Sequence, residues 1–182
     1  MRKNILTFGL LSGAIITAMM VITSLYFYNN PDYQGSMILG FGTMLLAFSM
    51  IFVAIKNYRD KFNNGVITFG KGFTIGLYIA LIASSIYVLV WLIEFYCFIP
   101  DFMDKYSAHM LKTAEAKGSS AAELAKEVAD INSMKGLYKN PIFVILLTYV
   151  EVLPLATLVA IISALILKRK TPPQNISDIP AV

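Results

Sequence analysis

The chain has 182 residues, of which 57% are hydrophobic and 14% are charged, and its mean hydropathy is +0.67. That is too little charge to cover the surface of a soluble domain of this length, so the composition favours an integral membrane protein. The one cysteine, Cys97, excludes an intrachain disulfide. With one histidine and no cluster of Cys, His and carboxylate side chains, we expect no metal site and no cofactor.

Four apolar runs are each long enough to cross a hydrocarbon core, which needs about 20 residues. They lie at residues 5–28, 35–55, 72–99 and 141–167. Because the backbone must satisfy its own hydrogen bonds in lipid, all four should be helices. The first run is too long for the core of a signal peptide, so we expect it to remain as a membrane helix. The sequence predicts one all-α transmembrane domain over residues 1–170 and a flexible cytoplasmic tail over residues 171–182.

The basic residues next to the apolar runs predict the orientation of the chain. Arg2 and Lys3 precede the first run, and two further groups follow the second and fourth runs. These two groups are Lys56, Arg59, Lys61 and Lys71, and Lys168, Arg169 and Lys170. With four spans all three groups lie on one side, which the positive-inside rule assigns to the cytoplasm. Orientation is a sufficient explanation for the basic turn, and a contact for anionic lipid or a cytoplasmic partner is the alternative.

The loop between the third and fourth runs should lie outside the cytoplasm and fold into two short helices. Its first half repeats apolar residues at a spacing of four, which is typical of one helix face, until Gly118 breaks the pattern. Ser120 and Glu123 then form a capping box, and Gly136 is expected to end the second helix. The sequence thus predicts an amphipathic helical hairpin over residues 101–136. It is either a plain connection or a docking surface for a partner.

Small residues recur at a spacing of four in three of the predicted helices, and such ridges let membrane helices approach closely. The residues concerned are Gly9 and Gly13; Gly72, Gly76, Ala80 and Ser84; and Ala156, Ala160 and Ala164. The pattern favours a compact bundle, or a dimer formed through one ridge.

Two carboxylates, Glu94 and Glu151, lie within apolar runs, where charged side chains are costly and often functional. Both fall in the outer half of the membrane, and no Lys or Arg shares that half. Glu94 continues the small-residue face of its helix, together with Tyr87. If the two carboxylates met, they could share a proton or bind a cation. Alternatively, each is protonated, hydrogen-bonded to Tyr, Ser or Thr, or reaches the outer water.

Several segments together resemble one family of bacterial membrane proteins. They are IKNYRDKFNNGVITFGKGF from Ile55, LIASSIYVLVW from Leu81, FIPDFMDKY, SSAAELAKEVADI, KNP, and EVLPLATLVAIISALILKRK from Glu151. In this combination the chain resembles the domain-of-unknown-function 4199 family over nearly its whole length. The resemblance implies a four-span bacterial inner-membrane protein without an assigned activity. Glu151 and Pro154 match the acid and proline that open the family's last span, whereas Leu155 stands where a glycine is usual.

These observations lead to two functional hypotheses. The sequence has no Ser-His-acid set, no HExxH motif, and no Cys-His pair whose positions favour catalysis. We therefore expect a protein that is not an enzyme. The leading hypothesis is a non-enzymatic scaffold or accessory subunit for a membrane partner, placed in the inner membrane with both termini cytoplasmic. The alternative is a small transporter or a proton- or cation-coupled component that uses Glu94 and Glu151. The expected partners are the lipid bilayer and either a membrane protein or a second copy of the chain, with no nucleic acid.

Overall fold

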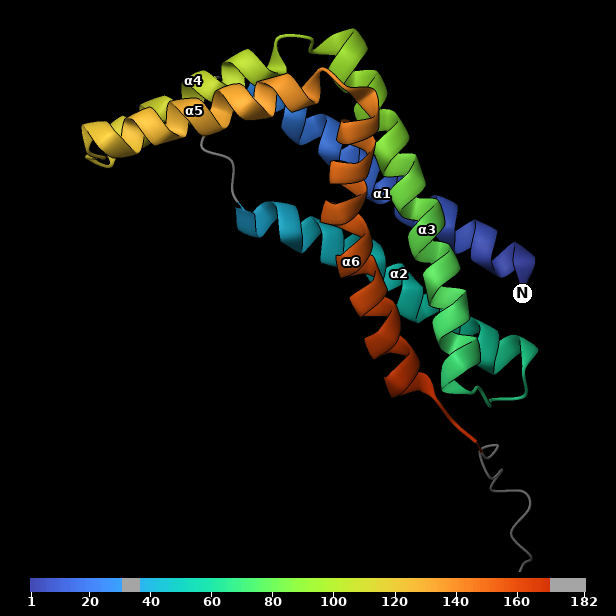
Figure 1. The fold of residues 1–182 in the computed structure, drawn as a ribbon. Helices are drawn as coiled ribbons and strands as arrows, with labels where there is room; N and C mark the ends of the chain where they lie inside the picture. The colour runs from blue at the N-terminus through green and yellow to red at the C-terminus, as the bar shows by residue number, and fades with distance from the viewer. Residues whose placement is uncertain (31–36, 171–182) are drawn as a thin grey trace, which may run out of the picture.

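The computed structural model describes residues 1–30 and 37–170, and the described chain is all-α, as predicted. Its helices are α1 (Arg2–Asn29), α2 (Met37–Phe62), α3 (Phe69–Ile93), the π-helical turn η1 (Glu94–Phe98), α4 (Phe102–Ala116), α5 (Ala121–Tyr138) and α6 (Pro141–Leu167) (Figure 1). Within the described residues, four helical stretches are long and apolar enough to cross a membrane: α1, α2, α3 with η1, and α6. The fold is therefore a membrane bundle of four helices. The predicted tail and the start of the predicted second span lie outside the described residues.

The second helix continues beyond the apolar run that predicted it. The prediction ended this span at residue 55, but α2 runs on to Phe62, so three of the four basic residues of the turn lie on its last helical turns. Only residues 63–68 connect α2 to α3, with Asn64 and Gly65 at φ 51° and 76°. An apolar run ends where the hydrocarbon ends, whereas a helix ends only where its backbone bonding stops. The Asn-Gly pair, which tolerates positive φ, supplies that stop.

The helical hairpin forms as α4 and α5, with one corrected boundary. Gly118 separates the two helices at φ 77°. Ser120 and Glu123 form the predicted capping box, in which each side chain accepts the other's backbone N–H. The predicted end at Gly136 is wrong, because α5 continues to Tyr138. Glycine permits a helix end without imposing one, whereas Pro141 disfavours helical geometry in the residue before it.

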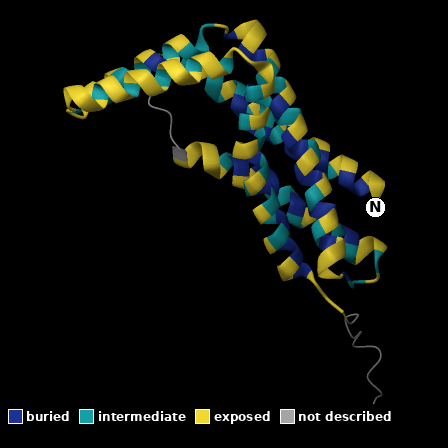
Figure 2. Ribbon diagram, in the orientation of Figure 1, coloured by how far each residue is buried: buried dark blue, intermediate teal, exposed yellow. Residues whose placement is uncertain are grey.

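The small-residue ridges of α3 and α6 face each other in the centre of the bundle (Figure 2). An added Cβ at Gly76 would lie 2.8 Å from the Cβ of Ala160, and one at Gly72 would lie 3.3 Å from that of Ala164. Both glycines therefore lie close to a facing alanine. The other predicted members of these two ridges, Ala80, Ser84 and Ala156, are fully buried.

The glycines of α1 pack against the opposite side of α3. An added Cβ at Gly9 would lie 2.9 Å from Ile82 Cγ2, and one at Gly13 would lie 2.6 Å from Ile86 Cδ1. The helix α3 thus lies at the centre, between α1 on one side and α6 on the other. All three ridges are used inside one bundle, so none of them requires a second copy of the chain.

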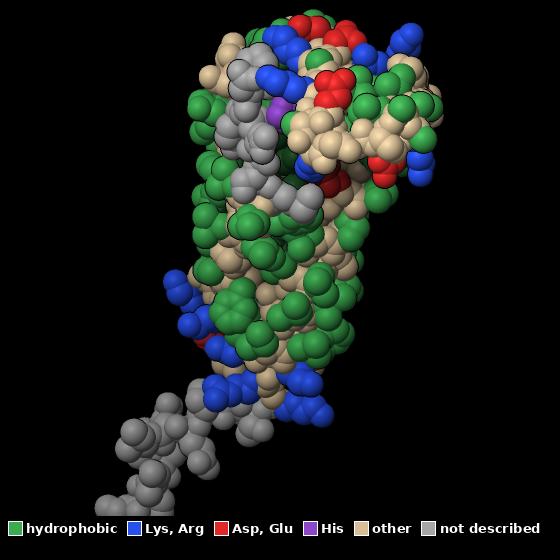
Figure 3. All heavy atoms as spheres, turned by 90° about the vertical axis from the view of Figure 1, so that its left-hand side faces the viewer, with side chains coloured by type: hydrophobic (Ala, Val, Ile, Leu, Met, Phe, Trp, Pro, Cys, Tyr) green, Lys and Arg blue, Asp and Glu red, His purple; other side chains and the backbone are tan. Residues whose placement is uncertain are grey.

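The two ends of the bundle differ in charge, and we name them the basic end and the hairpin end. At the basic end, the turn before α3 pairs with the chain after α6, because Ile67 and Arg169 exchange two backbone hydrogen bonds of 2.9 Å. Arg59 forms an ion pair with Asp60 at 2.6 Å in the same region. Figure 3 shows a belt of hydrophobic side chains, with Lys and Arg gathered towards one end and mixed charges at the other. The hairpin α4–α5 lies across that other end and projects beyond the bundle (Figure 1).

Candidate functional site

A cavity of about 360 Å³ lies at the hairpin end, between α3, α6 and the hairpin. Aromatic residues from three helices line it: Tyr87 and Trp91 on α3, Phe102 and Tyr106 on α4, and Tyr138 on α5. Met103 and Met134 complete the apolar wall, and Thr148 and Glu151 of α6 provide polar groups. Lys and Arg are absent from this lining among the described residues. The cavity is therefore an aromatic chamber with one acidic group.

Glu151 is the acidic group of this cavity. Its side chain is exposed, and within the described part of the chain it makes no ion pair and accepts no hydrogen bond. Thr148, one turn earlier on α6, is buried and donates its hydroxyl hydrogen to the carbonyl of Val144 at 2.7 Å. The carboxylate of Glu151 is therefore left without a protein partner of opposite charge.

Ring contacts hold the aromatic walls in place. Trp91 and Phe102 meet edge to face with their centroids 5.3 Å apart, and Phe102 stacks on Tyr106 at 6.1 Å. Tyr138 contacts Phe95 at 5.4 Å. Burial raises the pKa of Tyr138, and the nearby charge of Glu151 raises it further. These contacts fix the orientation of the rings before any ligand arrives.

The hairpin α4–α5 covers the cavity, and the beginning of α4 is attached to the end of α1. The hydroxyl of Tyr28 donates to Asp101 Oδ1 at 2.6 Å, and the ammonium of Lys105 lies 3.3 Å from the centroid of the Tyr28 ring. The Tyr28 hydrogen bond holds the pKa of Asp101 below its ordinary value, with a smaller contribution from the charge of Lys105. Phe27 adds ring contacts to Phe102 and His109 at 5.8 and 5.5 Å. The hairpin is thus tied to the bundle at its base.

Glu94 lies in a different environment from Glu151. It begins the π-helical turn, is 4% exposed, and accepts a hydrogen bond of 2.5 Å from the hydroxyl of Ser24 on α1. Its second oxygen, Oε2, is buried without a partner among the described residues. The two carboxylates form no hydrogen bond with each other. The arrangement in which they meet and share one proton is therefore not present.

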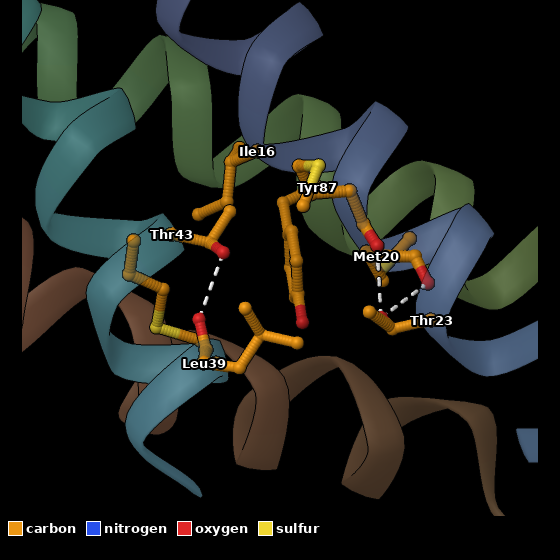
Figure 4. A pocket seen from close by; sticks show the side chains of 9 residues that line it. Ile16, Met20, Thr23, Leu39, Thr43 and Tyr87 are labelled. Atoms are coloured by element: carbon orange, nitrogen blue, oxygen red, sulfur yellow. Dashed lines mark hydrogen bonds between the residues drawn. The ribbon is translucent and has the colours of Figure 1, made fainter. Parts of the chain in front are cut away.

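Tyr87, the third residue of the predicted polar site, borders two cavities. It lines the aromatic cavity and also a smaller cavity of about 80 Å³ between α1 and α2. Figure 4 shows its ring directed into this smaller space, between Met20 and Thr23 on one side and Leu39 on the other. Tyr87 thus forms a shared wall of two cavities.

The other predicted positions lie away from the cavity. The basic residues of the turn and of the chain after α6 lie at the basic end, where Lys56, Lys61, Lys71, Lys168, Arg169 and Lys170 are exposed. Arg59 is partly buried, and its guanidinium also donates to the carbonyl of Leu167 at 3.4 Å. Lys71 lies over the ring of Tyr58, 5.5 Å from its centroid. These contacts join the helix ends to one another.

Sequence reasoning found Glu151 and Tyr87 but missed the rest of the cavity. Trp91, Phe102, Tyr106 and Tyr138 are spread over 48 positions, and three of them belong to the hairpin. Helix periodicity explained Phe102 and Tyr106, and no predicted pattern included Trp91 or Tyr138. The available signal was the density of aromatic residues from Tyr87 onwards, which exceeds what an amphipathic stripe needs.

The fold and the cavity together define a multi-pass membrane protein of four spans with a helical hairpin between the third and fourth. Residues 7–169 match the family model described as "Protein of unknown function (DUF4199)". The match covers most of the chain, and the protein belongs to this family. No curated protein and no solved structure matches the chain. No group of three or more His, Cys, Asp or Glu side chains able to hold a metal occurs in the described residues.

Proposed function

We propose that this protein is a non-enzymatic accessory subunit that contacts a second integral membrane protein through the hairpin α4–α5. It would lie in a bacterial inner membrane, with both termini in the cytoplasm and the hairpin outside. The positive-inside rule supports this orientation, because Lys and Arg predominate at the end opposite the hairpin, whereas the hairpin end carries both signs of charge. The observation that carries the proposal is the exposure of α5, the second helix of the hairpin.

That helix, α5, contributes no buried residue, although apolar side chains recur along it. Val128, Met134 and Leu137 are 41%, 39% and 44% exposed. A helix that leaves such side chains uncovered while its base is fixed is suited to contact a partner. The hairpin projects sideways beyond the bundle (Figure 1). The partner should therefore be a neighbouring membrane protein whose outer surface lies at the same level.

Gentle detergent extraction of a tagged chain tests this contact. We expect a stoichiometric partner to co-purify, and Val128→Glu and Leu137→Glu to abolish its recovery. Ala129→Glu is the matched control, because it adds the same charge at an exposed neighbouring position. A clean monomer from the unmodified chain, or equal recovery with all three variants, would contradict the proposal. If Val128→Glu or Leu137→Glu keeps the partner but weakens the contact of the hairpin with lipid in vesicles, the exposed face of α5 contacts the bilayer instead of a protein.

The orientation has its own experiment. A reporter fused after Lys170 should be active only in its cytoplasmic form, and one inserted at Gly118 should be active only in its periplasmic form. The reverse pattern would overturn the topology without affecting the fold.

A cation-coupled component is the second candidate, and two observations favour it. Among the described residues, no Lys or Arg lines the cavity that contains Glu151, and one oxygen of Glu94 is buried without a partner. This candidate predicts that Glu151→Gln abolishes proton or cation flux in proteoliposomes while leaving expression and folding intact. Flux that is unchanged in both Glu94→Gln and Glu151→Gln would exclude it.

A further inference from the structure

We propose that the cavity beneath the hairpin binds an organic ammonium ion, with Glu151 as its counter-ion and the rings of Trp91, Tyr106 and Tyr138 as its walls. This inference goes beyond the accessory role, because it assigns a ligand to the chain itself. It rests on the charge, the lining and the size of the cavity.

The charge favours a cationic ligand. Glu151 has no ion pair or hydrogen bond within the described chain, and no Lys or Arg lines the cavity with it. A bound cation would pair with this carboxylate in a cavity whose other walls are largely apolar and aromatic. The cavity therefore contains one carboxyl group that no Lys or Arg of the described chain accompanies.

The lining distinguishes an organic cation from a metal ion. Calcium and magnesium need six or more oxygen ligands, and this cavity offers a single carboxylate. Aromatic faces attract ammonium groups through cation–π interactions, and tryptophan does so best. Met103 and Met134 provide polarizable surface for alkyl substituents. An alkylated or quaternary ammonium matches this combination better than an inorganic ion does.

The size and position limit the ligand further. A volume of about 360 Å³ is at the small end of ligand sites, which begin near 300 Å³. The cavity lies at the hairpin end of the bundle, where α3 ends and α6 begins, and the ends of membrane spans lie near lipid headgroups. The ammonium could therefore belong to a free amine or to a phospholipid headgroup. Both sources present the same positive group to Glu151.

The chain carries its own reporter for binding, because Trp91 is its only tryptophan and lines the cavity. We would titrate the full-length protein in lipid-free detergent with choline and tetraethylammonium and follow tryptophan fluorescence. Saturable changes are expected with both. Sodium chloride at equal ionic strength and 3,3-dimethyl-1-butanol, the uncharged analogue of choline, should give none. A response to the uncharged alcohol equal to that of choline would overturn the proposal, and this comparison needs no variant.

Variants then assign the site to its carboxylate. Glu151→Gln should weaken choline binding by about tenfold or more, because it removes a charge-assisted contact. Glu115→Gln, an exposed acid of α4 outside the cavity, should leave it unchanged. Equal affinity in the two variants would remove Glu151 from the site.

Nanodiscs distinguish the two sources of the ammonium. If phosphatidylethanolamine fills the cavity, choline should bind more weakly in discs of that lipid than in phosphatidylglycerol discs. Equal affinity in the two discs assigns the site to a free amine. Failure of choline and tetraethylammonium to bind in detergent and in both discs would refute the proposal while leaving partner recovery by the hairpin untouched.

Discussion

Replacing Gly76 by alanine tests whether α3 and α6 are held together by close backbone approach. An added Cβ would lie 2.8 Å from the Cβ of Ala160 and 3.2 Å from its Cα, and also 3.0 Å from Ile51 Cγ2. Carbon atoms pack favourably at about 3.5–4.0 Å, so the contact is short by roughly 0.7–1.2 Å. The atoms of Ala160 are backbone or directly attached to it, so they cannot rotate away. The helices themselves must separate.

Such overpacking costs about 1–3 kcal/mol of unfolding free energy. The gain in helix propensity from glycine to alanine, about 1 kcal/mol in water, offsets only part of it. We expect a lower midpoint for unfolding by sodium dodecyl sulfate, followed by the fluorescence of Trp91. Gly42→Ala is the matched control, because an added Cβ there meets no atom within 4 Å. That variant should be at least as stable as the unmodified chain.

A second substitution makes the test specific. Ala160→Gly removes the Cβ that the new methyl group would meet, so the double variant should recover much of the stability lost by Gly76→Ala. The recovery is measured as a coupling energy in a double-mutant cycle. If Gly76→Ala were as stable as Gly42→Ala, or if Ala160→Gly brought no recovery, the contact between these two ridges would be refuted.

Three further predictions address other contacts. Ser24→Ala should lower the unfolding free energy by about 1–3 kcal/mol in the same assay, because it leaves a buried carboxyl group without its hydrogen bond. The pKa of Asp101 is lowered in the fold, so its ionised form stabilises the folded state. This stabilisation is complete above the unfolded pKa, near 3.9, and is lost as the pH falls through the folded pKa. Acid should therefore shift the tryptophan emission as the base of the hairpin loosens. Asp101→Asn should show the same shift already at pH 7. Identical emission from the variant and the unmodified chain at every pH would contradict this prediction. In a chain whose Cys97 is replaced by alanine, cysteines at positions 67 and 169 should cross-link on mild oxidation. Paired residues of this kind lie about 5.5 Å apart at Cα. A failure to cross-link would show that the turn before α3 does not pair with the chain after α6.

Much of the fold could be predicted because its signals are local. The length of each apolar run, the capping box at Ser120 and the left-handed position of Gly118 are all decided within a few residues. The ends of α2 and α5 could not be placed by the same means. Backbone bonding continues past Lys56 although hydropathy falls, and it continues past Gly136 until Pro141 stops it. Polarity and glycine were mistaken for helix stops, although neither breaks a hydrogen bond.

The candidate site was only partly accessible from the sequence. A carboxylate in an apolar run stands out at once, so Glu94 and Glu151 were identified. Their separation could not be foreseen, because it depends on how α1 and α6 pack around α3. Ser24 lies 70 positions from Glu94, yet it supplies the hydrogen bond. The cavity depends on where the hairpin turns back, which places Tyr138 within reach of Glu151.

The composition of α3 explains why packing and cavity occupy different halves of one molecule. Near the basic end, Gly72 and Gly76 face the alanines of α6 at close distance, and Ala80 is buried on the same face. Towards the hairpin the same helix carries Tyr87 and Trp91, whose larger rings line the aromatic cavity. Small residues thus serve close helix packing at one end of α3, and aromatic residues line a cavity at the other. The hairpin adds Phe102, Tyr106 and Tyr138 to that cavity and α6 adds Glu151, so the cavity combines a change in side-chain size along α3 with groups from two other parts of the chain.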